Sequence, residues 1–398
     1  MAFNDTLRIL LPFLFLTQCL QNFVRGEPQV PCYFIFGDSL VDSGNNNQLN
    51  TQAKANYLPY GVDFPEGFTG RFTNNRTITD IIGFLYFMIK LYIYIYSKVL
   101  LHLIYHHFTN YFLNAMCREI FEICAGQLLG FEDFIPPFAN KMEDIIRGVN
   151  YASAVSGIRD ETGKQQGDRI PLNEQLRNHL ITVLRITKIM KSASAARQYL
   201  QKCIYVVITG NNDYINNYFV PDIYPTSRLY TPQQFADGLA RQYSNQLKDL
   251  YFSGARKVAI FGVGLIGLTP EIIGRFGANY SMVNDAAQLF SNKLLPLVND
   301  LNSHLTGAKF TYINTTGITV TSNDSLSLLN TQDTCCPVVQ DLGTCVPGST
   351  PCTDRTQYAY FDGFHPTDVV NEGFAGRAYN EKLPSDASPY DISRLARL

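Results

Sequence analysis

Charge and tryptophan are the scarcest features of this 398-residue chain, which has no Trp, 17% charged residues and a formal net charge of −2. A chain so close to neutral offers no basic surface for nucleic acid or an anionic membrane, and we expect no nucleic-acid partner. Apolar residues make up 46% of the chain, which excludes global disorder and allows a large core. Nothing in the sequence indicates an obligate protein partner.

Histidine is also scarce, with six in the chain, and this narrows the search for a general base. Three of the six lie in the atypical segment 84–126, and we expect His179 and His304, in polar helical patterns, at the surface. His365 lies in AYFDGFHPTD, three residues after Asp362. A carboxylate at that spacing can bond the imidazole, fix its tautomer and stabilise the imidazolium formed during acyl transfer. A purely structural hydrogen bond would give the same spacing.

The motif G-x-S-x-G is missing, which disfavours the common α/β-hydrolase arrangement. Ser39 is the best candidate nucleophile, because in FIFGDSLVDSGNNN (34–47) an apolar run stops at Gly37 and Ser39 follows in the turn after it, where backbone N–H groups can stabilise developing charge. A helix N-cap is the alternative role for this serine. Asn212, in TGNND, can donate its amide to an oxyanion, and simple turn chemistry is the alternative there.

Strand and helix patterns alternate along the chain. Four short, nearly continuous apolar runs are typical of parallel strands covered on both faces: 33–39, 203–213, 256–264 and 309–314. Three helical patterns follow or separate them: 232–252, 285–305 and 366–381. The sequence therefore predicts an α/β fold with a mainly parallel sheet, whose functional loops lie at the carboxyl ends of the strands.

A glycine-rich run, Gly262 to Gly267, spells G-x-G-x-x-G after one of these strands. A dinucleotide site would need a helix that begins within the glycines. Leu268-Thr269-Pro270 follows instead and interrupts a helix at this point. We therefore expect no dinucleotide cofactor, and we interpret the glycines as shaping a loop on the substrate side.

Several features indicate export. Residues 1–26 combine an early arginine with a short apolar run and predict a signal peptide, a buried first helix being the alternative. Cysteines gather in CCPVVQDLGTCVPGSTPC, which predicts a disulfide-stapled loop, with pairings open, and fits zinc poorly: Cys335, Cys336, Cys345 and Cys352. Glycosylation sequons stand at four positions: Asn75, Asn279, Asn314 and Asn323. We expect a secreted protein of the extracellular space or cell wall.

Residues 84–126 differ from everything around them. The segment is dominated by Phe, Leu, Ile, Tyr, Lys, Asn and Met, and it holds no Pro, Asp or Gln. Its codons would be rich in A and T, and residues 76–83 and 127–138 would join into one amphipathic helix without it. We hypothesise a translated intron that interrupts a single domain over 27–398. A transmembrane anchor or a lipid-facing hairpin is the alternative.

Four sequence blocks resemble those of the plant-type GDSL esterase/lipase family, within the SGNH hydrolases. The blocks are FGDSLVDSGNNN, GVNYASAVSGIRDETG, TGNNDYINNYF and DGFHPT, and VAIFGVGLIGLTP and the cysteine loop match in order and spacing. The resemblance covers residues 30–385 apart from 84–126. It implies a three-layer α/β/α sandwich and ester hydrolysis through an acyl-enzyme, with neither metal nor cofactor.

The resemblance also implies a role for each matching residue. Ser39 would be the nucleophile, His365 the base and Asp362 the acid that orients it. Asn212 and the backbone N–H groups of Ser39 and Ala154 would bind the oxyanion, although the family often has glycine at the position of Ala154.

The substrate class stays open at this stage. A lipid, a cutin-like polyester and an acetylated polysaccharide are all chemically possible ester substrates. The alternative functions are a catalytically inactive or membrane-tethered product, caused by residues 84–126, and a lectin-like wall-binding protein that keeps the fold without catalysis.

Overall fold

The computed structural model describes residues 28–83, 128–140, 144–321 and 328–398. The chain divides into two units, the first of which is Met1–Gln29 with Phe84–Glu132. Within the described part of that unit, the backbone N–H and side-chain amide of Gln29 donate to the carbonyls of Leu129 and Leu128, both at 2.9 Å. The predicted signal peptide and the segment 84–126 lie outside the described residues. The second unit is Val30–Gly83 with Asp133–Leu398, and it contains the predicted catalytic residues.

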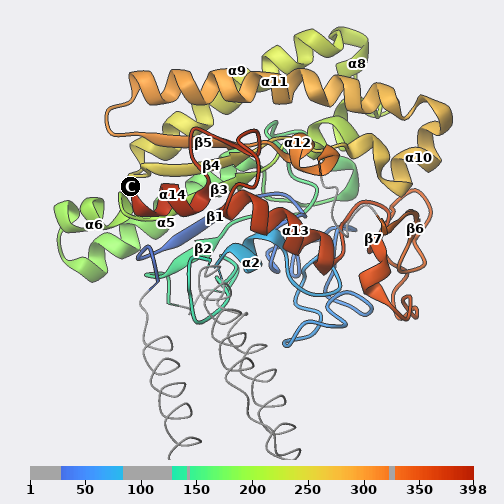
Figure 1. Ribbon diagram of the computed structural model, residues 1–398, viewed down its shortest axis with the longest axis horizontal. Coiled ribbons are helices and arrows are strands. Elements are labelled where there is room, and N and C mark those ends of the chain that lie inside the picture. Colours follow the sequence, from blue (N-terminus) through green and yellow to red (C-terminus); the bar gives the residue numbers. More distant parts are fainter. Residues whose placement is uncertain (1–27, 84–127, 141–143, 322–327) are drawn as a thin grey trace, which may run out of the picture. The chain divides into compact units, whose positions relative to one another are not determined.

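A six-stranded sheet in the order β2-β1-β3-β4-β5-β8 forms the centre of this second unit (Figure 1). Its strands are β1 (Tyr33–Gly37), β2 (Gly148–Asn150), β3 (Ile204–Ile208), β4 (Lys257–Phe261), β5 (Lys309–Ile313) and β8 (Ala387–Ser388). All neighbours are parallel except β8, which pairs antiparallel with β5. The four predicted strands are confirmed, and their continuous apolar character reflects burial on both faces.

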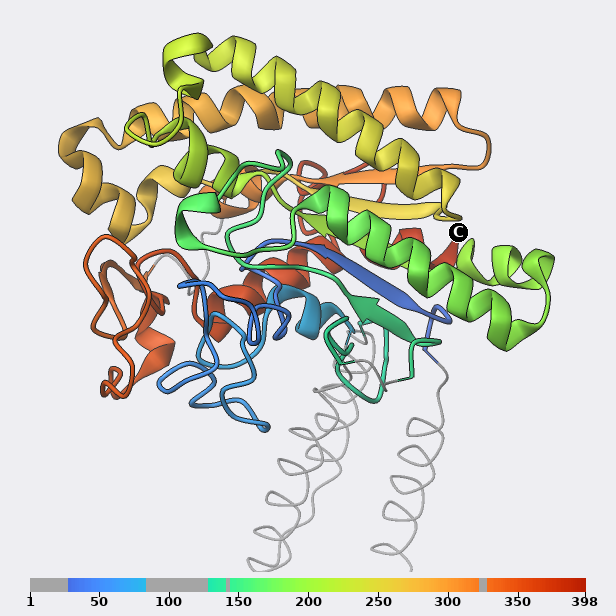
Figure 2. The ribbon, with the colours of Figure 1, turned by 180° about the vertical axis from the view of Figure 1, so that it is seen from behind.

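Helices cover both faces of the sheet, which confirms the three-layer α/β/α sandwich. One face, in front in Figure 2, carries α5 (Leu172–Met190), α9 (Pro232–Phe252) and α11 (Ser281–His304), with α6 (Ala193–Leu200) beside α5. The other face carries α2 (Ile78–Gly83), α13 (Asp368–Tyr379) and α14 (Ile392–Arg397).

Shorter elements connect these layers. They are η1 (Lys164–Gln166), α7 (Asn211–Asp213), η2 (Tyr214–Tyr218), α8 (Thr226–Leu229), η3 (Ile266–Leu268), α10 (Pro270–Phe276), η4 (Gly277–Asn279), α12 (Thr315–Val320), β6 (Asn330–Thr334), η6 (Arg355–Gln357) and β7 (Tyr358–Tyr360).

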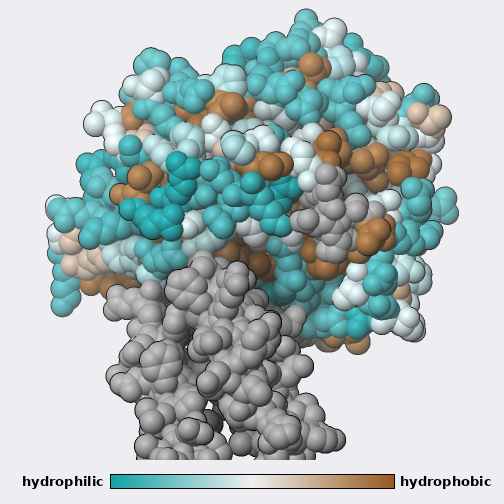
Figure 3. Space-filling view, in the orientation of Figure 1, coloured by the Kyte–Doolittle hydropathy of each residue, from teal (hydrophilic) through white to brown (hydrophobic). Residues whose placement is uncertain are grey.

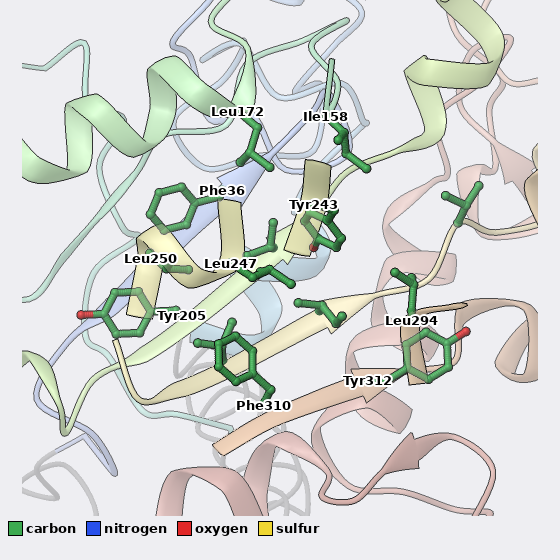
Figure 4. Packing of buried hydrophobic residues seen from close by; sticks show 14 of the residues in the cluster. Phe36, Ile158, Leu172, Tyr205, Tyr243, Leu247, Leu250, Leu294, Phe310 and Tyr312 are labelled. Atoms are coloured by element: carbon green, nitrogen blue, oxygen red, sulfur yellow. The ribbon is translucent and has the colours of Figure 1, made fainter. Parts of the chain in front are cut away.

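The largest hydrophobic cluster lies between the sheet and α5, α9 and α11. Figure 4 shows Phe36, Tyr205 and Phe310 of the strands packed against Leu247 and Leu294 of the helices. All five are at most 1% exposed. Burying a side chain of this size contributes roughly 1.5–3 kcal/mol, so this layer holds in place the strands whose carboxyl ends carry the functional loops.

The three predicted helices are confirmed, with shifted starts in two of them. Helix α13 begins at Asp368, two residues after the predicted start, because Thr367 is its N-cap and Pro366 lies before the helix. Helix α9 covers 232–252 as predicted, because Thr231 and Gln234 form a capping box and Pro232 occupies the first turn. Helix α11 begins at Ser281, four residues before the predicted start. In this chain, which contains residues 84–126, residues 128–138 form no helix. The continuous helix expected through 76–83 and 127–138 in a chain without 84–126 stays a prediction.

The expected surface position of His179 is also wrong. This side chain of α5 is fully buried, with its ring 5.0 Å from that of Phe34 and 5.6 Å from that of Tyr205. Burial lowers the pKa of His179 to about 3, so the imidazole is neutral. Periodicity misplaced it because α5 buries polar as well as apolar side chains, Gln175 and Thr182 among them. His304 is exposed, as expected.

The described residues form three disulfide bonds, and the predicted stapled loop is confirmed. Within it, Cys335 pairs with Cys352 and Cys336 with Cys345. The third bond, Cys32–Cys203, joins the residues just before β1 and β3 across 171 positions of sequence. Among the described residues, no helix combines the length and apolar character needed to cross a bilayer.

Candidate active site

The turn after β1 carries Ser39 to the carboxyl edge of the sheet. Gly37, the last residue of β1, has φ of 154°, and a Cβ there would lie 2.2 Å from the carbonyl oxygen of Ile208. Only glycine therefore allows β1 to lie so close to β3 at this point. Gln175 of α5 accepts from the N–H of Gly37 at 2.9 Å and donates to its carbonyl at 2.8 Å, which fixes the turn from the other side.

Ser39, His365 and Asp362 form a continuous chain of hydrogen bonds. Ser39 Oγ lies 2.8 Å from His365 Nε2, and His365 Nδ1 lies 2.8 Å from Asp362 Oδ2. The backbone N–H of His365 also donates to Asp362 Oδ1 at 2.8 Å. The carboxylate is fully buried and the imidazole nearly so. A serine on an imidazole held by a buried carboxylate is the arrangement that activates a hydroxyl for acyl transfer.

Tyr60 adds a fourth member that the sequence did not indicate. Its hydroxyl donates to Asp362 Oδ2 at 2.5 Å and accepts from the N–H of Cys345 at 3.0 Å. Tyr60 is fully buried and 302 residues from Asp362, so no local pattern could reveal the contact. The cysteine loop is thereby connected to the carboxylate that holds His365.

Asn212 lies on the turn after β3, in the wall of a cavity of about 70 Å³ that Ser39 and His365 also line. Its amide nitrogen donates to the carbonyl of Ser156 at 3.0 Å, and its oxygen accepts from Asn216 at 2.7 Å. One amide N–H is left over, because a primary amide has two donors. The adjacent Asp213 fixes this turn by accepting from the N–H groups of Ile158 and Arg159.

Ala154 lies in the wall of the same cavity, but its N–H is already bonded. It donates to Asp42 Oδ2 at 3.0 Å, which argues against its predicted place in the oxyanion hole. Within the described part of the chain, the N–H of Ser39 has no hydrogen-bond partner. The geometry therefore leaves Ser39 N–H and the Asn212 amide as donors beside the nucleophile.

Three buried carboxyl groups surround the site without belonging to the hydrogen-bonded chain. Burial raises the pKa of Asp38, of Asp42 and of Asp213 to about 6, against the opposing effect of the hydrogen bonds that each accepts. Asp38 accepts from Asn211 at 3.0 Å and so joins the turn after β1 to the turn after β3. Each of the three side chains is at most 1% exposed, so little water reaches these walls of the site, which strengthens electrostatic interactions inside it.

The four predicted glycosylation sites differ in their surroundings. Asn279 is exposed, whereas Asn75 is only 8% exposed, and its burial argues against it as a glycan acceptor. The side chain of Asn314 caps α12 by accepting from the N–H of Gly317 at 3.0 Å. Asn323 lies outside the described residues. Among the residues that are described, no group of His, Cys, Asp or Glu could hold a metal ion.

Replacing Tyr60 with phenylalanine is expected to lower kcat about 10-fold and to leave KM within about twofold. The substitution removes a hydrogen bond to a charged group, worth roughly 1.5–3 kcal/mol in general, and so loosens the carboxylate that orients His365. Steady-state kinetics on a soluble aryl ester measure it. Tyr57→Phe is the matched control, because Tyr57 donates to the Cys345 carbonyl and not to Asp362. A Tyr60→Phe enzyme with unchanged kcat would show that Tyr60 is only a packing residue.

Comparison with known proteins agrees with a site arranged for acyl transfer. A family model described as GDSL-like Lipase/Acylhydrolase matches residues 125–377. Two proteins named GDSL esterase/lipase from Arabidopsis thaliana are each 41% identical over 387 residues, which is 95% of this chain and 95% of the relative. A third protein of that name and organism is 40% identical over 385 residues, 94% of each chain.

Proposed function

The chain belongs to the GDSL-like lipase/acylhydrolase family and is a carboxylic ester hydrolase, and we propose that it acts through an acyl-enzyme on Ser39. The observation that carries the proposal is the 2.8 Å contact between Ser39 Oγ and His365 Nε2, with Asp362 behind the imidazole. This contact supports the proposal, because a general base must lie within hydrogen-bond reach of the proton that the serine loses.

In the first half of the reaction, Ser39 Oγ attacks the ester carbonyl while His365 Nε2 takes its proton. Asp362 stabilises the imidazolium that forms. The N–H of Ser39 and the free amide N–H of Asn212 stabilise the oxyanion. The intermediate then breaks its bond to the alkoxide, His365 returns the proton to that oxygen, and the alcohol leaves.

In the second half, His365 takes a proton from water as the water oxygen attacks the acyl carbon. The bond from that carbon to Ser39 Oγ breaks, and His365 protonates the serine. The carboxylic acid is released and the enzyme returns to its starting state, so one ester and one water give one acid and one alcohol.

Secretion is part of the proposal. Three disulfide bonds support it, because such bonds persist in oxidising compartments, and residues 1–26 supply the pattern of a signal peptide. The small cavity at Ser39 fits an ester carbonyl and its first atoms, a group that lipids, cutin-like polyesters and acetylated polysaccharides share.

A covalent label tests both parts of the proposal in one experiment. The full chain is expressed in plant cells, and enzyme recovered from the medium is treated with a fluorophosphonate. We expect a protein without residues 1–26 that gains one adduct, on Ser39, with loss of esterase activity. An adduct on another serine, or activity that survives labelling, would overturn the mechanism. Retention of the whole chain in the membrane fraction would overturn secretion and favour the tethered alternative.

A further inference from the structure

A second and larger cavity lies beside the one that holds Ser39. Its volume is about 470 Å³, within the roughly 300–1,000 Å³ usual for ligand pockets. The walls come from the loop after β4, from α10, α12 and α13, and from β7. Thr319 and Val320 of α12 line it and are exposed, so the cavity reaches the surface beside that helix.

The two cavities share part of their walls. Leu40, Asn211, Ile266 and Thr269 line both of them. Leu40 directly follows Ser39 in the sequence. These four residues lie where the two cavities meet, and a group joined to the carbonyl that Ser39 attacks would have to pass them to enter the larger cavity.

The lining determines what such a group can be. None of the described residues around the larger cavity is an aspartate, glutamate, lysine, arginine or histidine, and most are aliphatic or aromatic, such as Ile78, Phe261, Leu265, Ile273 and Phe374. A charged headgroup would find no counter-charge among them. The apolar residues outnumber the polar ones, so most of the wall can contact only an apolar group such as a flexible alkyl chain; the polar side chains are Asn211, Thr269, Thr315, Thr319, Thr331 and Gln332.

The glycine-rich loop helps to form this space. Gly262 and Gly264 both line the cavity. A Cβ on Gly262 would lie 2.7 Å from the hydroxyl of Tyr312, and one on Gly264 would lie 3.3 Å from the Cγ2 of Thr315. Thr315 lines the cavity, so a side chain at position 264 would crowd its wall, whereas Tyr312 belongs to the hydrophobic core, so a side chain at position 262 would disturb core packing. The G-x-G-x-x-G run that resembles a nucleotide motif therefore has a steric role here.

The outer face around the opening is also apolar. Figure 3 shows hydrophobic residues gathered on the side of the molecule where Figure 1 labels α10, α12, β6 and β7. Val320 is 66% exposed and Leu328 is 84% exposed in this region. An apolar chain entering from this side would leave water gradually along its path.

We propose that the larger cavity binds the aliphatic acyl chain of the ester, so that the enzyme prefers medium-chain acyl esters to acetyl esters. The proposal rests on the function proposed for Ser39 and names the substrate class of that site. Each methylene group that enters the cavity is expected to raise kcat/KM by up to about fourfold, the factor that follows from burying one such group.

The test uses 4-nitrophenyl esters with acyl chains from acetyl to octanoyl, below their micelle concentrations. We expect kcat/KM to rise at least about 50-fold across the series. In Ala359→Leu, which fills part of the cavity from β7, the octanoyl-to-acetyl ratio should fall at least about 10-fold. Thr319→Phe, on the exposed side of α12, should lower the ratio in the same direction and carries little risk for folding. Ala195→Leu, on the exposed side of α6, is the control and should keep the wild-type ratio.

A flat or falling series in an enzyme that is still labelled on Ser39 would overturn the cavity assignment and leave the proposed mechanism intact. A second series, acetates of alcohols of increasing length, separates the two ends of the ester. If kcat/KM rises with the length of the alcohol and not with that of the acyl chain, the cavity binds the alcohol and the proposal is wrong.

Discussion

Replacing Ser39 with alanine is expected to lower kcat/KM on a short-chain aryl ester by at least about 10⁴-fold. The substitution removes the only atom that can form the acyl bond, and the remaining groups can merely bind the substrate and polarise water. Stability should change little, because the Ser39 hydroxyl bonds to His365 at the wall of a cavity and not within the packed core. Hydrolysis rates and thermal unfolding of the two proteins, measured side by side, check both expectations.

Ser43 provides the matched control for this experiment. It lies four residues further along the same turn, is buried, and its hydroxyl has no hydrogen bond to any described residue. Ser43→Ala should therefore keep activity within about threefold. Activity above about a tenth of wild type in Ser39→Ala would reject Ser39 as the nucleophile. Absence of activity in the wild-type chain would direct attention to residues 84–126, and a chain without them would then be compared.

Replacing Asp80 with alanine is expected to lower the free energy of unfolding by about 3–5 kcal/mol at pH 7. Asp80 is buried and accepts two hydrogen bonds from Arg71, at 2.7 and 2.9 Å, and a third from the N–H of Thr77 at 2.8 Å. Its removal leaves the guanidinium of Arg71 buried with no opposite charge. It also removes the acceptor for the Thr77 N–H at the start of α2.

The effect of this substitution should depend on pH. Burial alone would raise the pKa of Asp80, but the charge and hydrogen bonds of Arg71 outweigh burial and lower it below 3.8. A carboxylate whose pKa is lowered on folding stabilises the folded state at pH values above its pKa in the unfolded chain. This stabilisation is lost as the pH falls through the folded-state pKa. The difference between wild type and Asp80→Ala should therefore be full at neutral pH and shrink below about pH 4.

Urea unfolding at several pH values measures this difference. Glu174→Ala is the comparison, because Glu174 and Arg177 form an exposed ion pair on α5, for which less than ~1 kcal/mol is expected. Equal losses in the two variants, or a loss in Asp80→Ala that does not vary with pH, would contradict the account of Asp80 as a buried, charged partner.

The parts of this molecule that the sequence predicted are those with a local pattern. The runs of β1, β3, β4 and β5 are apolar because both faces are covered, and α9 is marked at its start by Thr231 and Pro232. Ser39 is predictable because it follows the end of a strand, and His365 because Asp362 lies three residues before it. The resemblance to a family implies that the two residues act together. Their contact across 326 positions follows from the topology of the sheet.

The parts that escaped prediction depend on distant contacts. Tyr60 meets Asp362 across 302 positions, and nothing near Tyr60 distinguishes it from the other tyrosines. His179 sits in a helix with polar residues on its buried side, which defeats any argument from periodicity. The N–H of Ala154 is bonded to Asp42, and backbone orientation of this kind has no signature in residue types.

The bond between Cys32 and Cys203 has a consequence for the accuracy with which the site is assembled. It joins the chain just before β1 and just before β3, two strands paired in register from Tyr33 with Ile204 to Gly37 with Ile208. Ser39 and Asn212 leave the far ends of these strands. A slip of one residue between the strands would displace one of these groups from the other by about 3.3 Å, more than a hydrogen bond spans. The disulfide at the N-terminal ends of β1 and β3 therefore fixes their register. It excludes slipped pairings, which would give a similar sheet but leave Ser39 out of line with Asn212.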